Sequence, residues 1–463
     1  MDGEGRAVSG SAGAREWLGH PVGLFYLAFA EAWERFSYYG MQTLLVLYLT
    51  QALLLPPRVG RIALFGPFRA LLDSAGTLDI IALSSAIFGL YTSAVYLTPI
   101  FGGLLADRVL GKRRTVILGA LLMAAGHFLM AFDVTFLFAL LLLVLGVGCF
   151  KGNIASQVGA LYAPEDNRRA DAFQIYFIGI NAGVIIAPLV CGTLGEKVGW
   201  HWGFGAAGVG MLIGLGIYLA GQRYLPDDSV PVAARADVAP TPPMTRRQKQ
   251  ALILLVAMIP VLAISALGNQ ELYNAYLVWA NGAYDFQLLG VRLPTTFLAS
   301  LDAVASVASL IGVVAFWRWY ATRFREPDEI VKLAIGCVIS AAAFVIVAVS
   351  ARHEAATGIK VSLWVAVAIH FINGIGFSNV FPVSLALYSR ASPPQFAGTM
   401  IGVYYLFLFL ANLGVGVIGG FLNKMPPLAF WGLHVALVLG AGAAFVLIKL
   451  AFGRILIDER AAA

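Results

Sequence analysis

The sequence predicts an all-α, polytopic membrane protein with twelve transmembrane helices in two six-helix bundles. Of its 463 residues, 60% are hydrophobic and only 12% are charged, whereas a soluble globular protein has about 45–50% apolar and about 25% charged residues. The apolar residues fall into twelve long runs, each close to the roughly 20 residues that a helix needs to cross a bilayer. A polar linker separates the first six runs from the last six.

Six spans are predicted on each side of the linker. The first six cover residues 22–53, 80–105, 115–132, 135–157, 172–194 and 202–219. The last six cover residues 251–280, 296–319, 330–350, 361–388, 398–422 and 430–451. We therefore divide the chain into a cytoplasmic N-terminal segment (1–21), an N-terminal bundle (22–222), a cytoplasmic linker (223–249), a C-terminal bundle (250–452) and a cytoplasmic tail (453–463).

The basic residues set the orientation, because cytoplasmic loops carry an excess of lysine and arginine. With both termini inside, 21 of the 31 basic residues lie in cytoplasmic segments, eight lie outside, and Arg35 and Lys151 remain within the membrane. The net charge of +6 thus reports topology, with no nucleic-acid binding implied. Residues 1–21 lack the apolar core of a cleavable signal peptide, so we expect the first helix to act as the signal.

The first span carries three charges, Glu31, Glu34 and Arg35, where lipid is expected. Each costs roughly 2.5–3.5 kcal/mol at the bilayer centre, so they must be sheltered inside the protein. Together with Tyr38 and Gln42 they follow helical spacing along one face, which we expect to look inward. Glu31 and Arg35 are spaced to pair along the helix, which leaves Glu34 in need of another partner.

Three further charges, Lys151, Glu271 and Asp302, lie within predicted spans. A charge inside the membrane needs an opposite charge, so we expect Lys151 to pair with one of the first-span glutamates. The alternative is that Lys151 extends its ammonium group to the membrane edge. Counting all six intramembrane charges, the acids outnumber the cations by four to two. Two acids without a counter-charge can bind and release protons, as a proton-driven carrier requires.

Four segments carry a resemblance to a known family. Residues 31–40 are similar to the E-x-x-E-R-F-x-Y-Y-G signature of the proton-coupled oligopeptide transporters, a branch of the major facilitator superfamily. Residues 102–114 resemble the G-x-L-A-D-R-x-x-G-x-R-R loop of the superfamily. Residues 146–153 resemble the G-x-x-F-K-P-N segment of the peptide transporters, with Gly152 in place of the proline. Residues 173–183 resemble the F-Y-x-x-I-N-x-G segment of the same family. The resemblance implies the major facilitator fold. Because the linker has only about 27 residues, we expect no pair of extra helices between the bundles.

The resemblance also implies roles for particular residues. A zwitterionic peptide needs a cationic patch for its carboxylate and an acidic or amide patch for its ammonium group, so Arg35 and Lys151 are assigned to the first, and Asn181 with Glu271 to the second. The full sets are Glu31, Glu34, Arg35, Lys151, Glu271 and Asp302 for proton coupling, Arg35, Tyr38, Tyr96, Lys151, Asn181, Glu271 and Tyr404 for substrate binding, and Asp107, Arg108 and Gln42 for gating.

Each role has a plainer alternative. Asn181 could instead form a hydrogen bond between two helices. The loop with Asp107 could be a simple positive-inside anchor, and the tyrosines could serve only for packing. Two positions depart from the family, since many relatives have an arginine in place of Gln42 and a glutamate in place of Phe377. Glu271 thereby loses its expected arginine, so its partner is expected to be a neutral donor such as Gln42, or Glu271 itself is protonated.

These observations predict a carrier that brings di- and tripeptides into the cell with protons, by alternating access, in a bacterial inner membrane. The alternative is a same-fold carrier of another small anion or zwitterion, such as nitrate or an amino-acid derivative. An enzyme is not expected, because no nucleophile with a base and no metal site is recognisable. We expect a monomer in the lipid bilayer, with no cofactor besides the proton. Cys149, Cys191 and Cys337 are interpreted as buried thiols, and all six histidines as structural or interfacial.

Overall fold

The computed structural model describes residues 15–163, 166–226 and 244–456, which are mostly helical. The N-terminal bundle consists of α1 (Val22–Tyr48), α3 (Ile80–Leu105), α4 (Lys112–Leu129), α5 (Phe136–Ala160), α6 (Arg168–Ala187) and α7 (Trp200–Gly221). Short π-type turns, η1 (Leu49–Leu53), η4 (Ala106–Leu110), η6 (Pro188–Gly192) and η7 (Leu194–Val198), extend three of these helices. The predicted spans of the first half therefore correspond one to one with these helices.

The C-terminal bundle has two interrupted spans. It consists of α8 (Arg246–Glu271) with α9 (Ala275–Ala283), α10 (Phe297–Ala321), α11 (Glu329–Thr357), α12 (Leu363–Ala391), α13 (Ala397–Tyr404) with α14 (Leu406–Ile418), and α15 (Pro427–Leu456). The seventh span breaks directly after Glu271, and the eleventh breaks at Tyr405. Backbone groups freed inside a membrane are tolerated only where the protein covers them or where they line a cavity, so neither break is expected to face lipid.

Ten spans among the described residues are long and apolar enough to cross a membrane. The two bundle helices outside that set are α1, which carries three charges, and α4, which is 18 residues long and begins with Lys112, Arg113 and Arg114. Both are packed as full members of the N-terminal bundle, α1 against α6 and α7 and α4 against α5. The prediction of twelve helices is confirmed. Most of the proposed linker (227–243) lies outside the described residues, and α8 already begins at Arg246.

Three small elements were not predicted from the sequence. Helix α2 (Phe65–Leu72) lies in the connection between α1 and α3. Two antiparallel hairpins, β1 (Glu16–Trp17) with β2 (His20–Pro21) and β3 (Gln287–Leu288) with β4 (Val291–Arg292), flank α1 and α10. Each strand has only two residues, which is too short for an alternating pattern to be recognised.

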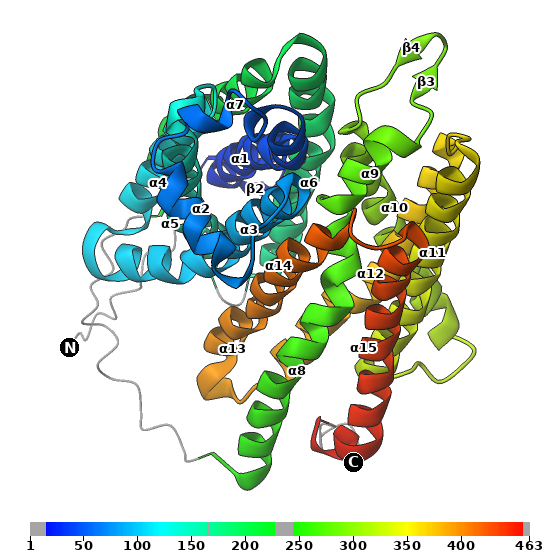
Figure 1. Ribbon diagram of the computed structural model, residues 1–463. Helices are drawn as coiled ribbons and strands as arrows, with labels where there is room; N and C mark the ends of the chain where they lie inside the picture. The colour runs from blue at the N-terminus through cyan, green and yellow to red at the C-terminus, as the bar shows by residue number, and fades with distance from the viewer. Residues whose placement is uncertain (1–14, 164–165, 227–243, 457–463) are drawn as a thin grey trace, which may run out of the picture.

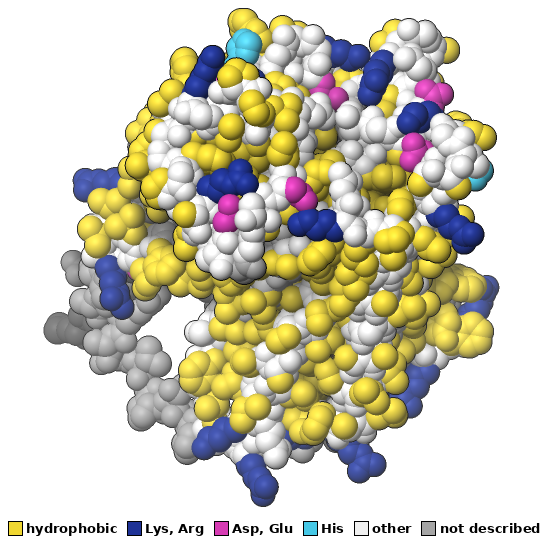
Figure 2. Space-filling model, viewed as in Figure 1, with side chains coloured by type: hydrophobic (Ala, Val, Ile, Leu, Met, Phe, Trp, Pro, Cys, Tyr) yellow, Lys and Arg dark blue, Asp and Glu magenta, His cyan; other side chains and the backbone are white. Residues whose placement is uncertain are grey.

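The two bundles lie side by side, with the N-terminal half in blue to green and the C-terminal half in green to red (Figure 1). We call the side where α1 begins and α15 ends the termini side, and the opposite one the far side. Helix α3 packs on α14, and α6 packs on α10, across the boundary. The visible face of the C-terminal bundle is largely hydrophobic, with lysine and arginine side chains at its termini-side end (Figure 2), as the predicted orientation in a membrane requires.

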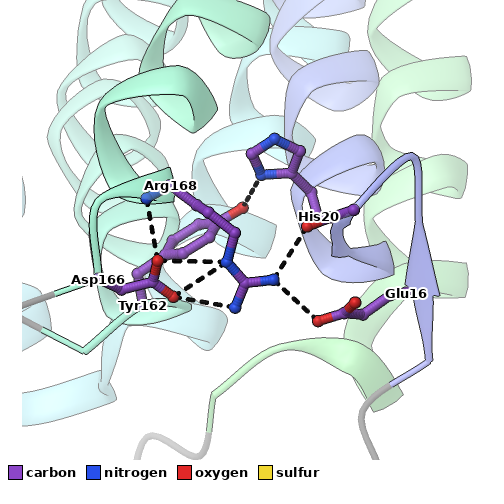
Figure 3. Close-up of polar contacts among 6 residues, drawn as sticks. Glu16, His20, Tyr162, Asp166 and Arg168 are labelled. Carbon is purple, nitrogen blue, oxygen red and sulfur yellow. Dashed lines mark hydrogen bonds and ion pairs between the residues drawn. The ribbon is translucent and has the colours of Figure 1, made fainter.

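A charged cluster fixes the start of α1 on the termini side (Figure 3). Arg168, at the start of α6, donates hydrogen bonds to Asp166, to Glu16 at 3.0 Å and to the Gly19 carbonyl at 2.9 Å. His20 contacts the Tyr162 hydroxyl at 2.8 Å. The β1–β2 hairpin is therefore tied to the loop between α5 and α6. The Arg168 guanidinium also lowers the pKa of the Asp166 carboxyl below its ordinary value.

We predict that Arg168→Gln releases the β1–β2 hairpin, because the forked guanidinium contacts cannot be replaced by one amide. Hydrogen exchange of residues 15–21 should accelerate several-fold, while Arg223→Gln, which removes an arginine stacked on Tyr224, leaves it unchanged. Because the pKa of Asp166 is lowered, the protection should be complete at neutral pH and lost as the pH falls below about 4. Equal exchange in both variants would contradict this role.

Candidate functional site

A cavity of about 1730 Å³ lies between the two bundles. Its wall is built by α1, α3, α5 and α6 from the N-terminal bundle and by α10, α12 and α13 with Tyr405 from the C-terminal bundle. The contributing residues of α3, α5 and α12, and all those of α10 except Val307, lie in the second half of the helix, and that half approaches the termini side in all four. The cavity is thus displaced toward the termini side.

Most polar side chains of the wall come from the N-terminal bundle. From the N-terminal bundle, Glu31, Tyr96, Lys151, Tyr176 and Asn181 face the cavity. The C-terminal bundle supplies mainly aliphatic and aromatic residues, and its polar contributions are Arg318 and Tyr405; the other members of this wall are Val307, Leu310, Ile311, Val314, Ala315, Phe381, Leu385 and Gly402. A small ligand with separated charges would therefore find its charged partners mainly on the N-terminal side.

The charges of α1 form one cluster. The Arg35 Nε atom lies 3.0 Å from Glu31 Oε1 and 2.6 Å from Glu34 Oε2, and none of the three residues is more than 6% exposed. Arg35 thus pairs with both acids, whereas the sequence led us to expect a separate partner for Glu34. The arrangement is possible because Glu34 precedes Arg35 directly, and both side chains can turn to the same guanidinium. The cluster retains a net negative charge.

Lys151 completes the charge balance without a direct ion pair. Its Nζ atom lies 4.6 Å from the centroid of the Tyr96 ring, a cation–π contact. Among the described residues no carboxylate lies within 4.0 Å of it. The expected contact with a first-span glutamate is therefore not formed in this conformation. Lys151 is half-buried and lines the cavity beside Glu31.

Asn181 also lines the cavity. Its side-chain amide donates to the Phe177 carbonyl one turn earlier in α6, at 2.8 Å. This bond within one helix replaces the helix-to-helix bond considered from the sequence. It fixes the side chain and leaves the amide oxygen as an acceptor.

Several predicted site residues lie outside the cavity wall. Tyr38 is 4% exposed and packs against Tyr91. The centroid of its ring lies 5.8 Å from the guanidinium carbon of Arg35. Tyr404 is fully buried and contacts Ser384 and the Phe381 carbonyl, each at 2.9 Å. The next residue, Tyr405, lines the cavity instead.

Glu271 and Asp302 are also absent from the wall, and each faces a histidine. Asp302 accepts from Tyr273 at 3.0 Å and contacts His370 Nδ1 at 3.0 Å. Glu271 lies 3.5 Å from His434 Nε2 and accepts from Asn274 and from the Ala275 backbone, both at 3.1 Å. The two acids that lacked a counter-charge in the sequence thus have imidazole partners. The interpretation of all six histidines as structural or interfacial did not include these contacts with buried acids.

The far side of the molecule is closed by contacts between the bundles. Glu196 in η7 accepts hydrogen bonds from the backbone N–H groups of Thr295 at 2.8 Å and Thr296 at 2.9 Å, at the start of α10. A carboxylate at a helix N-terminus is stabilised by both the free N–H groups and the helix dipole. Gly89 and Gly416 meet where α3 crosses α14, and an added Cβ on Gly89 would lie 2.6 Å from the Asn412 carbonyl. Sequence analysis did not identify this role of Glu196.

The residues assigned to gating are placed differently. Asp107 and Arg108 lie in η4, are exposed, and form no ion pair within 4.0 Å among the described residues. This is what a gate on the open side of the cavity would show. Gln42 is 5% exposed and makes no hydrogen bond to Glu271, whose partners lie in the C-terminal bundle.

The three cysteines lie buried and unpaired, as expected. Among the described residues, no group of three or more His, Cys, Asp or Glu side chains converges as a metal site would require.

Two membrane-spanning bundles around a cavity that is closed at one end define a solute carrier. The chain belongs to the POT family, whose sequence model matches residues 113–239 and 233–430. It is therefore a multi-pass protein of a transporter family, as the motifs indicated.

Individual relatives cover nearly the whole chain. A peptide transporter of Yersinia enterocolitica, YePEPT, is 30% identical over 515 aligned positions, covering 94% of this chain and 95% of the relative. A di-/tripeptide transporter of Lactococcus lactis subsp. cremoris is 28% identical, covering 85% and 88%. A crystal structure of a mutant POT peptide transporter with alafosfalin superposes with a TM-score of 0.79 at 27% identity, covering 96% and 98%.

We predict that Glu196→Ala weakens the closure of the far side. Loss of a capping carboxylate costs about 1 kcal/mol, which is roughly a fivefold change in population. Residues 80–89 and 412–420 lie where α3 meets α14, and they do not contact Glu196 directly. Their hydrogen exchange should accelerate by about the same fivefold. The matched control is Glu354→Ala, which removes a carboxylate paired with Lys360 inside one bundle. Equal exchange in the two variants would show that Glu196 does not hold the bundles together.

Proposed function

We propose that this protein imports di- and tripeptides by proton-coupled symport and alternating access. The observation that carries the proposal is the cavity between the bundles, with Glu31, Lys151 and Asn181 on one wall and an apolar wall opposite. The charged wall matches the two ends of a zwitterion, and the apolar wall matches variable side chains. The names of the relatives and the bound alafosfalin in a family structure support the same substrate class.

Lys151 is our proposed partner for the peptide carboxylate. Its ammonium group is half-buried, faces the cavity and has no ion pair within 4.0 Å among the described residues. Arg35 is assigned to the same carboxylate, but it already contacts two acids. Protonation of Glu31 or Glu34 would weaken that hold and add a second cation to the carboxylate site. Binding of a proton would in this way favour binding of the peptide.

Asn181 and Glu31 are our proposed partners for the peptide ammonium group. Asn181 offers its amide oxygen, and Glu31 is the only carboxylate among the described residues that line the cavity. Glu271, which was expected to share this role, is fully buried outside the wall. In our proposal Glu271 and Asp302 act in proton coupling alone.

The proposed orientation places both termini in the cytoplasm of a bacterial cell. The cavity then opens toward the cytoplasm in this conformation, with the far side closed. An inward proton gains about 2.3 kcal/mol per 100 mV of membrane potential, which is enough to drive accumulation of a neutral peptide. One chain builds the whole cavity, so the proposal needs no second subunit, no catalytic step and no cofactor besides the proton.

Proteoliposome uptake tests the proposal directly. We predict that labelled dialanine accumulates when an inward proton gradient is imposed and that an uncoupler abolishes the accumulation. Unlabelled dipeptide should compete, and nitrate or free alanine should not. If dialanine neither enters nor competes while nitrate or an amino-acid derivative does, the alternative substrate class is correct.

We predict that Lys151→Ala loses accumulation of dialanine by more than about tenfold, because loss of a charge-assisted contact costs about 1.5–3 kcal/mol. The matched control is Lys332→Ala. Lys332 also makes a cation–π contact, with the ring of Trp317, but it does not line the cavity. A Lys151→Ala variant that still concentrates dialanine against its gradient would refute this assignment.

A further inference from the structure

We propose that Glu271 and His434 form one proton-binding site, with a single proton held between Glu271 Oε2 and His434 Nε2 while the far side is closed. The inference rests on the proton coupling proposed above and names the partner of the acid. Glu271 ends α8 at the break in the seventh span, and His434 lies in α15, the last span. Both side chains are 0% exposed, and the two atoms are 3.5 Å apart.

The other ring nitrogen determines how many protons the pair holds. His434 Nδ1 lies 3.0 Å from the Phe430 carbonyl oxygen, one turn earlier in α15. A carbonyl can only accept a hydrogen bond, so Nδ1 must carry a hydrogen. In the neutral imidazole Nε2 then has no hydrogen and presents a lone pair. In the imidazolium Nε2 also carries a hydrogen.

A carboxylate oxygen facing that lone pair would place two acceptors in contact inside the membrane. Glu271 Oε2 and His434 Nε2 each have no hydrogen-bond partner among the described residues. Glu271 Oε1, by contrast, accepts from Asn274 and from the Ala275 backbone. One proton between the two unpartnered atoms satisfies both. It resides either on Glu271 as the neutral acid or on His434 as the imidazolium, and the pair is electrically neutral in both forms.

The surroundings contain no competing charge. Aromatic rings enclose His434: Phe430 and Trp431 from its own helix, with centroids 5.0 and 5.3 Å away, and Phe344 from α11 at 5.9 Å. Tyr276 of α9 packs on Trp431, and its hydroxyl is hydrogen-bonded to the hydroxyl of Tyr284. Among the described residues no lysine or arginine lies within 4.0 Å of the Glu271 carboxylate. The other titratable pair, Asp302 with His370, lies beyond Tyr276.

The site lies directly under the contact that closes the far side. Gly419 in η11 separates Glu271 from Ser85 of α3, because an added Cβ there would lie 2.9 Å from Glu271 Oε1 and 2.8 Å from Ser85 Oγ. Helix α3 belongs to the opposite bundle, and it packs against η11 and α14. A change in the proton content of the pair therefore acts next to the surface that separates when the far side opens.

The test compares gradient-driven uptake of dialanine with its counterflow, an exchange of labelled for unlabelled dialanine that needs no net proton movement. His434→Gln keeps an N–H donor but cannot take up a proton. We expect the ratio of driven uptake to counterflow to fall by about tenfold, the effect of about one unit of pKa, and its pH dependence to flatten. Glu271→Gln should lower the ratio equally. The double variant should be no worse than either single one, because both remove the same proton.

The matched control is His127→Gln in α4. His127 is also 0% exposed, and neither ring nitrogen has a partner among the described residues. Its variant should retain the wild-type ratio. A wild-type ratio and pH profile in His434→Gln, or additive losses in the double variant, would overturn the inference while leaving the proposed function intact. Loss of all counterflow in both His434→Gln and His434→Asn would also count against it, as a structural role. Failure of the wild-type protein to show driven uptake would instead refute the proposed function.

Discussion

The ion cluster of Glu31, Glu34 and Arg35 is the constraint on which the rest of the structure depends. Three charges within a membrane span are tolerated only if the protein encloses them, and here one guanidinium contacts both carboxylates in a buried setting. This requirement turns the polar face of α1 inward, toward α6 and the cavity. The helices that line the cavity are thus arranged around a cluster that has one acid in excess.

The two bundles treat their buried acids differently. The N-terminal bundle uses basic side chains: Arg35 contacts Glu31 and Glu34, and Lys151 lines the cavity beside Glu31. The C-terminal bundle uses imidazoles, His370 and His434, for Asp302 and Glu271. An imidazole changes charge at physiological pH, whereas a guanidinium does not. The acids of the C-terminal bundle thus face groups that can change charge, whereas Glu31 and Glu34 face one that cannot.

The sequence was sufficient to predict the twelve helices and four of the six polar cavity residues of the N-terminal bundle. Glu31 and Lys151 were found because they are charges in apolar runs, and the family resemblance indicated Tyr96 and Asn181. The partners of Glu271 and Asp302 were missed because His434 and His370 are distant in sequence, and no spacing rule connects them. Tyr404 was assigned through the family resemblance, whereas the next residue, Tyr405, lines the cavity. The Glu196 contact joins two bundles, and one sequence contains no signal for such a pairing.

Proton movement driven by the peptide alone tests the central claim most directly. Proteoliposomes with equal pH on both sides and a pH indicator inside would receive an outside pulse of dialanine. The buried, exchangeable acids predict that the lumen acidifies as the peptide enters, and that vesicles without the protein show no change. Entry of dialanine without a pH change inside would contradict coupling through these acids, whatever the substrate range.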